Sequence, residues 1–511
     1  MIMPTFRQRF QISQFLPADM SDIQTIGLTI FGFYFLVVAG IGLVAARYQQ
    51  STDDFWVAGR RFGLVIMVMA NMAAILNGGA LISGAGYAAK FGGVAILPFF
   101  GFSVGMAIIF FWIAKKLRQY GGITLPDYMG DRFESHALRA WSALIVAFSS
   151  IVALIAQIRG MAFVLETLLE IPFFWGLVLG TAIFVVYVAL GGLLAVVWTN
   201  IAQFVFVWLG LLVLAPAIYE QVGGWFEVLS KVEQVAPGWT SIKGVAWSWS
   251  YLISWHLVWM VAYCTRIELI TKMYAARDHK VARYSLPITV LLVILFLLYG
   301  NFYLGAATRI LVWEQVSSAD QGFPLLVAQY LSPLVAAFVL TGIASAAMST
   351  TDSLLLMSGS AIAHDFVRRT LHEPRGIERD EKYYLRISRW SIVIIGVVAF
   401  LAAIPTVSLL LKIVSFAVAI VGACFFFPLL LGLNCRWVSR EAALASSIGG
   451  VAMTVIWIVA SMSGAAWAQN LHPGLPGLAT AFILIVSVSI ATRPVSITTM
   501  QRFFGDNHVR S

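Results

Sequence analysis

Long apolar stretches separated by short polar loops make up most of the chain. Each stretch is close to the roughly 20 residues that an α-helix needs to cross a bilayer. Runs such as 96–114 and 286–299 are unbroken, whereas β-barrel strands alternate over short segments. The ninth stretch is too long for one straight crossing and is expected to continue past the bilayer. The pattern predicts an all-α polytopic membrane protein with about thirteen transmembrane helices, at 23–46, 64–88, 94–114, 138–164, 172–194, 198–219, 246–265, 285–308, 325–362, 390–405, 407–433, 442–462 and 474–492.

Composition excludes several classes of protein. Of the 511 residues, 60% are hydrophobic and 11% are charged, whereas a soluble domain carries about 25% charged residues. Too few charges remain to cover a soluble enzyme, a nucleic-acid binder or a disordered chain. No Walker loop, metalloprotease helix, nucleophile elbow or carboxylate pair is present, so no enzymatic activity is expected.

The distribution of charge predicts the orientation of the chain. If the N-terminus lies outside, most of the 33 Lys and Arg residues fall in loops on the inner side, as the positive-inside rule requires. The inner loop after the seventh span would then hold Arg266 and Lys272. We therefore expect a plasma (inner) membrane protein with its C-terminus in the cytoplasm. The net charge of +9 is an insertion signal, so the lipid bilayer is the expected partner, and neither nucleic acid nor an obligatory protein partner is indicated.

The second predicted span contains a weak point for a continuous helix. Asn77, Gly78 and Gly79 lie at mid-depth. Unwound backbone there would offer carbonyls to a cation and amides to a substrate. Close packing of small residues between helices is the alternative interpretation.

The ninth predicted span carries several hydroxyl groups. Ala346, Ser349 and Thr350 stand at positions i, i+3 and i+4, so they share one helix face. Neutral oxygens without a carboxylate suit a monovalent cation, whereas Ca²⁺ sites usually recruit carboxylates. Hydrogen bonding of Ser and Thr to their own helix explains the same spacing equally well. Asp352 lies nearer the inner end, where interhelical bonding and gating are equally plausible roles.

Further polar and aromatic residues lie within predicted spans. Arg159, close to Gln157, is a buried-charge candidate that suits a substrate carboxylate, although pairing with Glu166 or Glu170 is the more favoured interpretation. An aromatic stripe in the seventh span is more typical of packing than of a binding wall. The substrate-binding candidates are Asn77, Gly78, Gln157, Arg159, Trp255 and Trp259.

Several segments resemble the sodium:solute symporter family, which includes sodium/proline- and sodium/pantothenate-type symporters. The resemblance implies a LeuT-like fold in which two inverted repeats of five helices, at 64–219 and 246–433, follow one leading helix, at 23–46. Two trailing helices at 442–492 complete a single membrane transport domain. The segments that carry the resemblance are 51–60, 122–128, 191–203, 346–356 and 428–437.

The resemblance also implies a site for Na⁺ as the coupling ion. By the family pattern, carbonyls of Ala73 and Leu76 in the first core helix join Ala346, Ser349 and Thr350 in the eighth. The resemblance therefore favours the cation interpretation of that helix face.

Two departures from the family pattern affect what is expected. Asn200 stands where many members have Asp, which in some helps to hold a second sodium ion. Asn200 is therefore assigned to gating or coupling, and Asp352 near the inner end of its span is given the same assignment. The seventh span lacks Gly and Pro, so the break that the family has there is not visible.

The sequence therefore predicts a secondary active, sodium-coupled importer of a small organic solute, with an amino acid such as proline as the first candidate. The alternatives are a monocarboxylate or pantothenate-like acid held by Arg159, proton coupling, and a non-transporting solute receptor or sensor.

Overall fold

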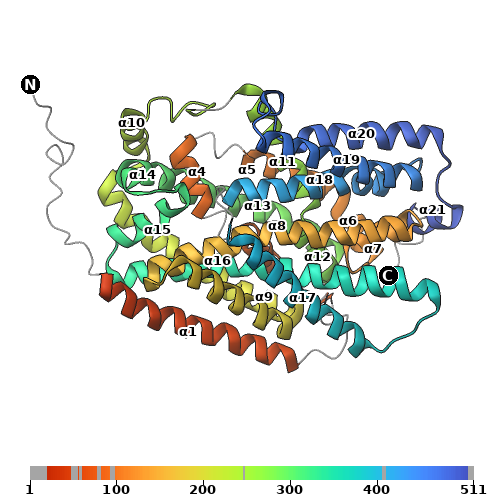
Figure 1. The fold of residues 1–511 in the computed structure, drawn as a ribbon, viewed down its shortest axis with the longest axis horizontal. Helices are drawn as coiled ribbons and strands as arrows, with labels where there is room; N and C mark the ends of the chain where they lie inside the picture. The colour runs from red at the N-terminus through yellow and green to blue at the C-terminus, as the bar shows by residue number, and fades with distance from the viewer. Residues whose placement is uncertain are drawn as a thin grey trace, which may run out of the picture.

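The computed structural model describes residues 20–47, 56, 60–76, 82–92, 98–245, 248–405 and 410–504. These residues form helices that run roughly along one direction and pack into a bundle (Figure 1). The helices are α1 Met20–Arg47, α3 Leu64–Ile75, α4 Gly84–Phe91, α5 Pro98–Ile108, η5 Ile109–Ile113, α6 Ala114–Tyr120, α7 Leu125–Arg132, α8 His136–Leu169, α9 Phe173–Val222, α10 Trp225–Val235, α11 Trp249–Thr265, α12 Ile267–Ala275, α13 His279–Phe296, η6 Leu297–Tyr303, α14 Leu304–Leu311, η7 Trp313–Gln315, α15 Ala319–Tyr330, α16 Pro333–Ser360, η8 Ala361–His372, η9 Glu373–Arg375, α17 Glu381–Ala403, α18 Leu410–Asn434, α19 Arg440–Met462, η10 Ala466–Ala468, α20 Gly474–Ala491 and α21 Ile497–Phe504.

The helical membrane architecture predicted from the apolar pattern is confirmed. Eight of the described helices are long and apolar enough to cross a membrane, and shorter apolar helices accompany them. The predicted fifth and sixth spans both lie in α9, where two helical segments meet at Gly192 with φ 56° and ψ −165°. Glycine adopts this left-handed conformation without steric strain, so it provides the joint. The full number of crossings and the division into two repeats stay predictions.

The seventh predicted span is followed by a second half-helix. α11 ends at Thr265, Arg266 is extended with φ −62° and ψ 114°, and α12 then begins at Ile267. All nine residues of α12 are buried. The prediction that Arg266 and Lys272 lie in an inner loop is therefore wrong. The prediction took their charges as a sign of a solvent-exposed loop, but both side chains are buried and donate to backbone carbonyls of α3.

The ninth predicted span, 325–362, was also placed wrongly at its start. Residues up to Tyr330 belong to the separate helix α15, and α16 begins at Pro333. Proline is favoured in the first turn of a helix, where its missing N–H leaves no bond unmade. At the other end the helix continues through η8 to His372, which agrees with the expectation that it extends further.

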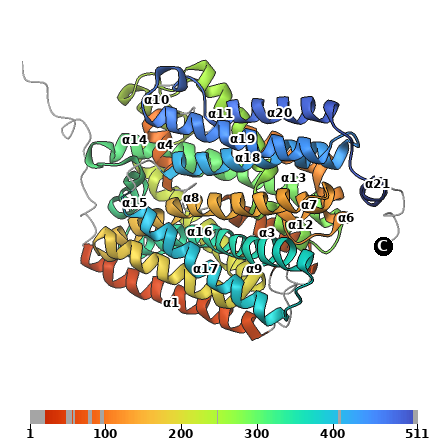
Figure 2. The same cartoon turned by 45° about the vertical axis from the view of Figure 1, so that its right-hand side comes forward.

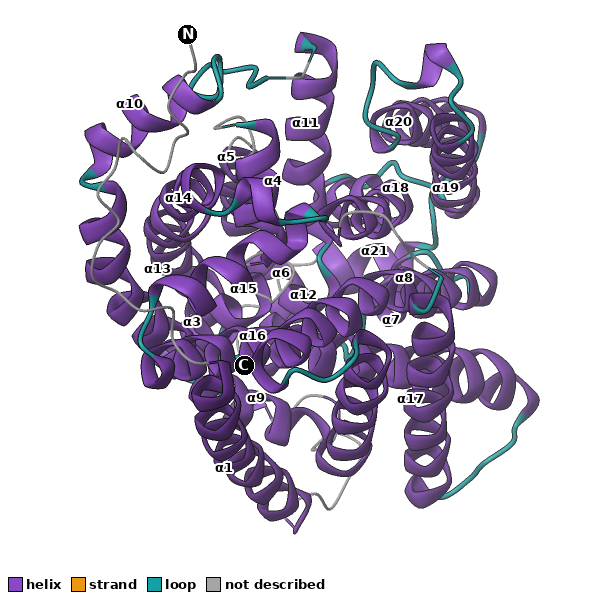
Figure 3. Ribbon diagram, turned by 60° about the vertical axis from the view of Figure 1, so that its left-hand side comes forward, coloured by secondary structure: helices purple, strands orange, loops and turns teal. Residues whose placement is uncertain are grey.

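The helix α16 lies at the centre of the bundle. In the apolar 18-residue stretch of the helix that begins with α16, 83% of residues are buried, against 33% in the corresponding stretches of α17 and α20. Figure 3 shows α16 surrounded by α3, α9, α12 and α15, all of which it contacts. The helix α1 lies along one edge of the bundle, and α19 and α20 lie along the opposite edge (Figure 2). The groups on α16 are thus held away from lipid.

The two ends of the bundle carry different elements. Helices α4, α10, α14 and α15 lie at one end, and α6, α7 and α21 lie at the other (Figure 1). These are the ends that the charge pattern predicts to face outside and inside, respectively.

An ion-pair network holds the end that carries α7. Asp131 of α7 accepts hydrogen bonds from Arg139 of α8, from Arg369 of η8 at 2.9 Å and from Arg502 of α21 at 3.3 Å. Asp127 of α7 lies 3.4 Å from Arg369 and 3.9 Å from Arg139. The network therefore ties α7 to three other elements.

The charge state of Asp127 follows from these neighbours. Burial would raise the pKa of Asp127, but His364 at 3.8 Å, Arg369 and Arg139 outweigh it. The pKa of Asp127 accordingly lies below its ordinary value, and the carboxylate is charged at neutral pH.

We expect Asp127→Asn to lower the free energy of unfolding by about 2 kcal/mol, because Arg139 and Arg369 each lose one of the carboxylates beside them and keep Asp131. A depressed pKa means that this stabilisation is present above about pH 4 and is lost only as the pH falls further. Thermal unfolding of the purified protein measures the loss, which we expect to be at least as large at about pH 5 as at about pH 7.5. Glu378→Gln, at an exposed acid before α17, is the matched control. A loss that is smaller at about pH 5 than at about pH 7.5 would contradict a lowered pKa for Asp127.

Candidate functional site

The site begins at the C-terminal end of α3. The amide of Leu76 donates to the carbonyl of Met72 at 2.8 Å, and Leu76 itself leaves the helix with φ −83° and ψ 65°. The last four carbonyls of an α-helix have no intrahelical donor. They also carry the negative end of the helix dipole, so they attract cations. The carbonyls of Ala73 and Ala74 belong to this set.

Hydroxyl groups of α16 approach these carbonyls directly. The Oγ of Ser349 lies 2.8 Å from the carbonyl oxygen of Ala73 and 2.8 Å from that of Ala346. The Oγ1 of Thr350 lies 3.4 Å from the carbonyl oxygen of Ala74. The single hydrogen of Ser349 can go to only one carbonyl at a time. A cation among these oxygens would satisfy all of them together.

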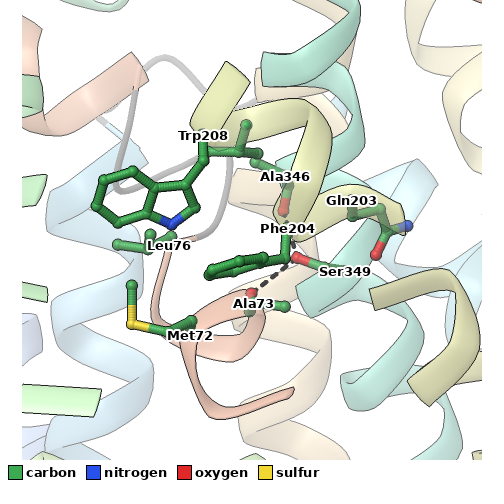
Figure 4. A pocket seen from close by; sticks show the side chains of 9 residues that line it. Met72, Ala73, Leu76, Gln203, Phe204, Trp208, Ala346 and Ser349 are labelled. Atoms are coloured by element: carbon green, nitrogen blue, oxygen red, sulfur yellow. Dashed lines mark hydrogen bonds between the residues drawn. The ribbon is translucent and has the colours of Figure 1, made fainter. Parts of the chain in front are cut away.

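A small pocket lies beside this contact (Figure 4). Its volume is about 10 Å³, which is room for one water-sized sphere. Figure 4 shows Ser349 between Ala73 of α3 and Ala346 of α16. The lining residues are Met72, Ala73, Leu76, Gln203, Phe204, Val207, Trp208, Ala346 and Ser349.

The residues present fit a sodium ion. Of the five predicted ligands, Ala73, Leu76, Ala346 and Ser349 line one pocket. Thr350, the fifth, faces the carbonyl of Ala74, which follows the predicted ligand Ala73 in the chain. The oxygens that make these contacts are neutral carbonyls and hydroxyls, which suit a small monovalent cation better than a divalent one.

A buried aspartate of α15 connects three elements of the bundle. Asp320 of α15 is 2% exposed and accepts a hydrogen bond from Ser83 at 2.9 Å and from the Leu410 amide at 3.2 Å. A Cβ on Gly86 would lie 2.2 Å from the carbonyl oxygen of Ala319, so glycine lets α15 rest against α4. Asp320 therefore links α15 to the start of α4 and the start of α18.

The predicted coupling residues Asn200 and Asp352 are fully buried. Neither side chain has a hydrogen-bond partner among the residues that the structure describes. Burial of such groups in a membrane protein is costly and marks functional positions. Their assigned roles in gating or coupling stay predictions.

The predicted substrate residues are spread over the bundle. Arg159 donates to the carbonyl of Ala403 at 2.8 Å and lies over the ring of Phe173 at 4.8 Å. The prediction that it pairs with Glu166 or Glu170 is not met, because Arg159 forms no ion pair with either acid among the described residues and donates a hydrogen bond to the Ala403 carbonyl. Gln157 is buried on α8, while Asn77 and Gly78 lie outside the described residues.

The aromatic pair on α11 packs against another half-helix. Trp255 stacks on Tyr87 of α4 with ring centroids 5.7 Å apart, and Trp259 lies 6.2 Å from Trp255. Both tryptophans are buried and absent from the lining of the small pocket. Their part in substrate binding stays a prediction.

Sequence reasoning missed two groups of residues near the site. Gln203 and Trp208 of α9 line the pocket, and nothing in their spacing indicated this. Arg266 donates to the carbonyl of Ala74 at 2.8 Å, and Lys272 donates to that of Ala70 at 2.7 Å. Two basic residues directly after an apolar span were the available signal, but they were assigned to a loop.

The sequence is similar to that of known transporters over nearly its whole length. The profile of the sodium:solute symporter family matches residues 55–450. The osmoregulated proline transporter OpuE of Bacillus subtilis (strain 168) is 27% identical over 488 residues, covering 93% of this chain and 96% of its own. The sodium/proline symporter of Escherichia coli (strain K12) is 26% identical over 505 residues, covering 96% of this chain and 98% of its own.

The fold is similar to that of solved transporters. A Na⁺-coupled sialic acid symporter in a substrate-bound outward-open state aligns with a TM-score of 0.76 at 18% identity, covering 92% of this chain and 99% of its own. Mhp1, a nucleobase-cation-symport-1 family transporter in a closed conformation, aligns with a TM-score of 0.52 at 15% identity, covering 89% and 98%. The family match covers well over half of the sequence, and the chain therefore belongs to the sodium:solute symporter family.

Proposed function

We propose that this symporter imports a small amino acid such as proline together with one sodium ion. The contact between Ser349 Oγ and the Ala73 carbonyl is the observation that carries the proposal. It joins the central helix α16 to the free end of α3, so an ion bound there stabilises one relative position of the two helices. The named activity of the relatives OpuE and the E. coli symporter supports proline as the first candidate.

In the proposed cycle, sodium enters between α3 and α16 and holds the end of α3 against Ser349 and Thr350. The solute then binds beside Asn77 and Gly78, with Gln157, Arg159, Trp255 and Trp259 as further candidates. Rocking of one helix group against the other then closes the end of the bundle that carries α15 and opens the end that carries α7, where sodium and solute are released. The proposed orientation places the start of α1 outside and α21 in the cytoplasm.

The energy available favours a solute with no net charge. One charge crossing about 100 mV contributes about 2.3 kcal/mol, and a tenfold sodium gradient contributes about 1.4 kcal/mol. Together these sustain a roughly 500-fold accumulation of a zwitterion. With a monovalent anion the voltage term cancels, and only about tenfold remains. Asn200 in place of the family's Asp supports a single sodium ion, so a zwitterion is the better-driven cargo.

Two other functions lead to different outcomes. Proton coupling predicts uptake that is unaffected when choline replaces sodium at fixed pH. A receptor or sensor predicts solute binding without counterflow across the membrane.

We expect Ser349→Ala combined with Thr350→Ala to reduce uptake in sodium to the level seen in choline, because the two hydroxyl ligands are lost together. Uptake of labelled L-proline into proteoliposomes under a sodium gradient is the measurement. Ser358→Ala is the matched control, since Ser358 is buried on the same helix and, among the residues that the structure describes, its hydroxyl donates only to the Leu355 carbonyl, at 2.8 Å. Unchanged sodium dependence in the double variant would defeat the proposed ion site.

Transport of one sodium ion with a zwitterion moves one positive charge inward per cycle. A potassium diffusion potential of about 100 mV, inside negative and without a sodium gradient, should therefore drive a roughly 50-fold accumulation of L-proline. Accumulation of L-proline that does not respond to the potential would contradict the transport of one sodium ion with one zwitterion.

A further inference from the structure

A buried ion pair stands at the break between α11 and α12. Arg266 occupies the extended position between the two half-helices, and Glu268 lies in the first turn of α12. The Nε of Arg266 is 3.5 Å from a carboxylate oxygen of Glu268, and each side chain is 7% exposed. At 3.5 Å the pair lacks a good hydrogen bond at Nε. The guanidinium therefore has capacity for a stronger anionic partner.

The same guanidinium touches the proposed sodium site. The Nη2 of Arg266 donates to the carbonyl of Ala74 at 2.8 Å, and Thr350 approaches that carbonyl at 3.4 Å. Ala74 directly follows Ala73, whose carbonyl contacts Ser349. A residue from the second broken helix thus shares one acceptor with a predicted sodium ligand.

The charges on this half-helix are unequal in number. Arg266 and Lys272 are two buried basic groups, and Glu268 is the one acidic group that lies within ion-pair distance of Arg266 in the described part of the chain. Lys272 is bonded to the carbonyl of Ala70 at 2.7 Å, away from Ala74. Buried charge is tolerated where it meets a partner or a substrate.

A row of aromatic rings leads along α11 to the guanidinium. Ring centroids are 6.2 Å apart from Trp255 to Trp259 and 5.8 Å apart from Trp259 to Tyr263. The guanidinium of Arg266 then lies 5.7 Å from the ring of Tyr263. The row starts beside Tyr87 of α4, toward the end of the bundle that carries α15. The row is therefore a series of buried aromatic rings that ends at a cation.

We infer that Arg266 receives the carboxylate of the transported solute and, in doing so, leaves the Ala74 carbonyl to sodium. This inference rests on the proposed sodium-coupled import and names the solute class as small molecules with a carboxylate. Guanidinium binds carboxylate through two parallel hydrogen bonds, which a single backbone carbonyl cannot match. Once Arg266 turns to the solute, Ala74 regains a free oxygen beside Ala73 and Thr350. Solute binding therefore improves the sodium site, and sodium improves the solute site by the same factor.

Arg159 is less suited to this task. Its guanidinium is bonded to the carbonyl of Ala403 near the end of α17 and covers Phe173. It contacts neither α3 nor Ser349 in the described structure, so a carboxylate bound there would not change the sodium site.

The first test compares acids with analogues that lack the carboxylate, on the wild-type protein. Sodium affinity is measured by titration of the purified protein, alone and with L-proline, acetate or pantothenate, and with L-prolinamide, acetamide or panthenol. We expect at least one acid to tighten sodium binding by roughly tenfold or more, and no analogue without a carboxylate to do so. Equal tightening by an acid and its analogue, or tightening by none of the acids, would overturn the inference.

The second test removes the guanidinium. Arg266→Gln combined with Glu268→Gln takes away both charges, so that no unpaired Glu268 remains. We expect this variant to lose the acid-induced tightening yet to bind sodium alone at least as tightly as wild type, because Ala74 is no longer occupied. A purely structural role for Arg266 predicts weaker sodium binding instead. Arg266→Lys should restore part of the acid response.

The controls separate this inference from the proposed function. Lys272→Gln removes the other buried basic group of α12, and we expect it to keep the acid-induced tightening. Retention of the tightening in the Arg266 and Glu268 double variant would overturn the inference while leaving sodium-driven uptake by wild type intact. Absence of sodium-driven uptake by wild type would instead overturn the proposed function, because that measurement does not depend on any Arg266 variant.

Discussion

The free carbonyls at the C-terminal end of α3 are the constraint around which the rest of the site is arranged. A helix that stops inside a membrane leaves acceptors that neither water nor lipid can satisfy. Here Ser349 and Thr350 of α16 and Arg266 of the second broken helix supply the missing donors. Each of these contacts bridges segments far apart in sequence. The end of α3 is consequently the point at which α16 and the break between α11 and α12 contact neighbouring carbonyls.

This arrangement gives a physical basis for coupling. A hydroxyl and a guanidinium are donors that can move away, and a sodium ion can take their place among the same oxygens. The end of α3 then changes partner without ever being left unpaired. Asp320 links α15 to Ser83 and Leu410 at one end of the bundle, and the Asp127 and Asp131 network holds the opposite end. Polar contacts thus hold both ends, and the proposed rocking of the helices requires these contacts to break.

The sequence was sufficient for the architecture because hydrocarbon permits few solutions. Apolar stretches predicted the helices. The spacing of hydroxyls along residues 346–350 left two interpretations open, and the family resemblance indicated that this face of α16 meets α3. The break at Arg266 could not be predicted in the same way, since it has neither glycine nor proline and its charges resemble those of a loop. The partner of Arg159 was missed for a related reason, because backbone carbonyls are present at every position and leave no pattern. Gln203 reaches the pocket through the packing of α9 on α16, which only the three-dimensional arrangement determines.

The central claim is that one cation replaces the direct contact between Ser349 and Ala73. An experimental structure determined in sodium with a transported solute tests it most directly. The account predicts density for an ion bonded to the carbonyls of Ala73, Leu76 and Ala346 and to the hydroxyls of Ser349 and Thr350, and the Ala74 carbonyl joins them once Arg266 has turned to the solute. A structure in which the Ser349 hydroxyl still donates to the Ala73 carbonyl while transported solute is bound would contradict it.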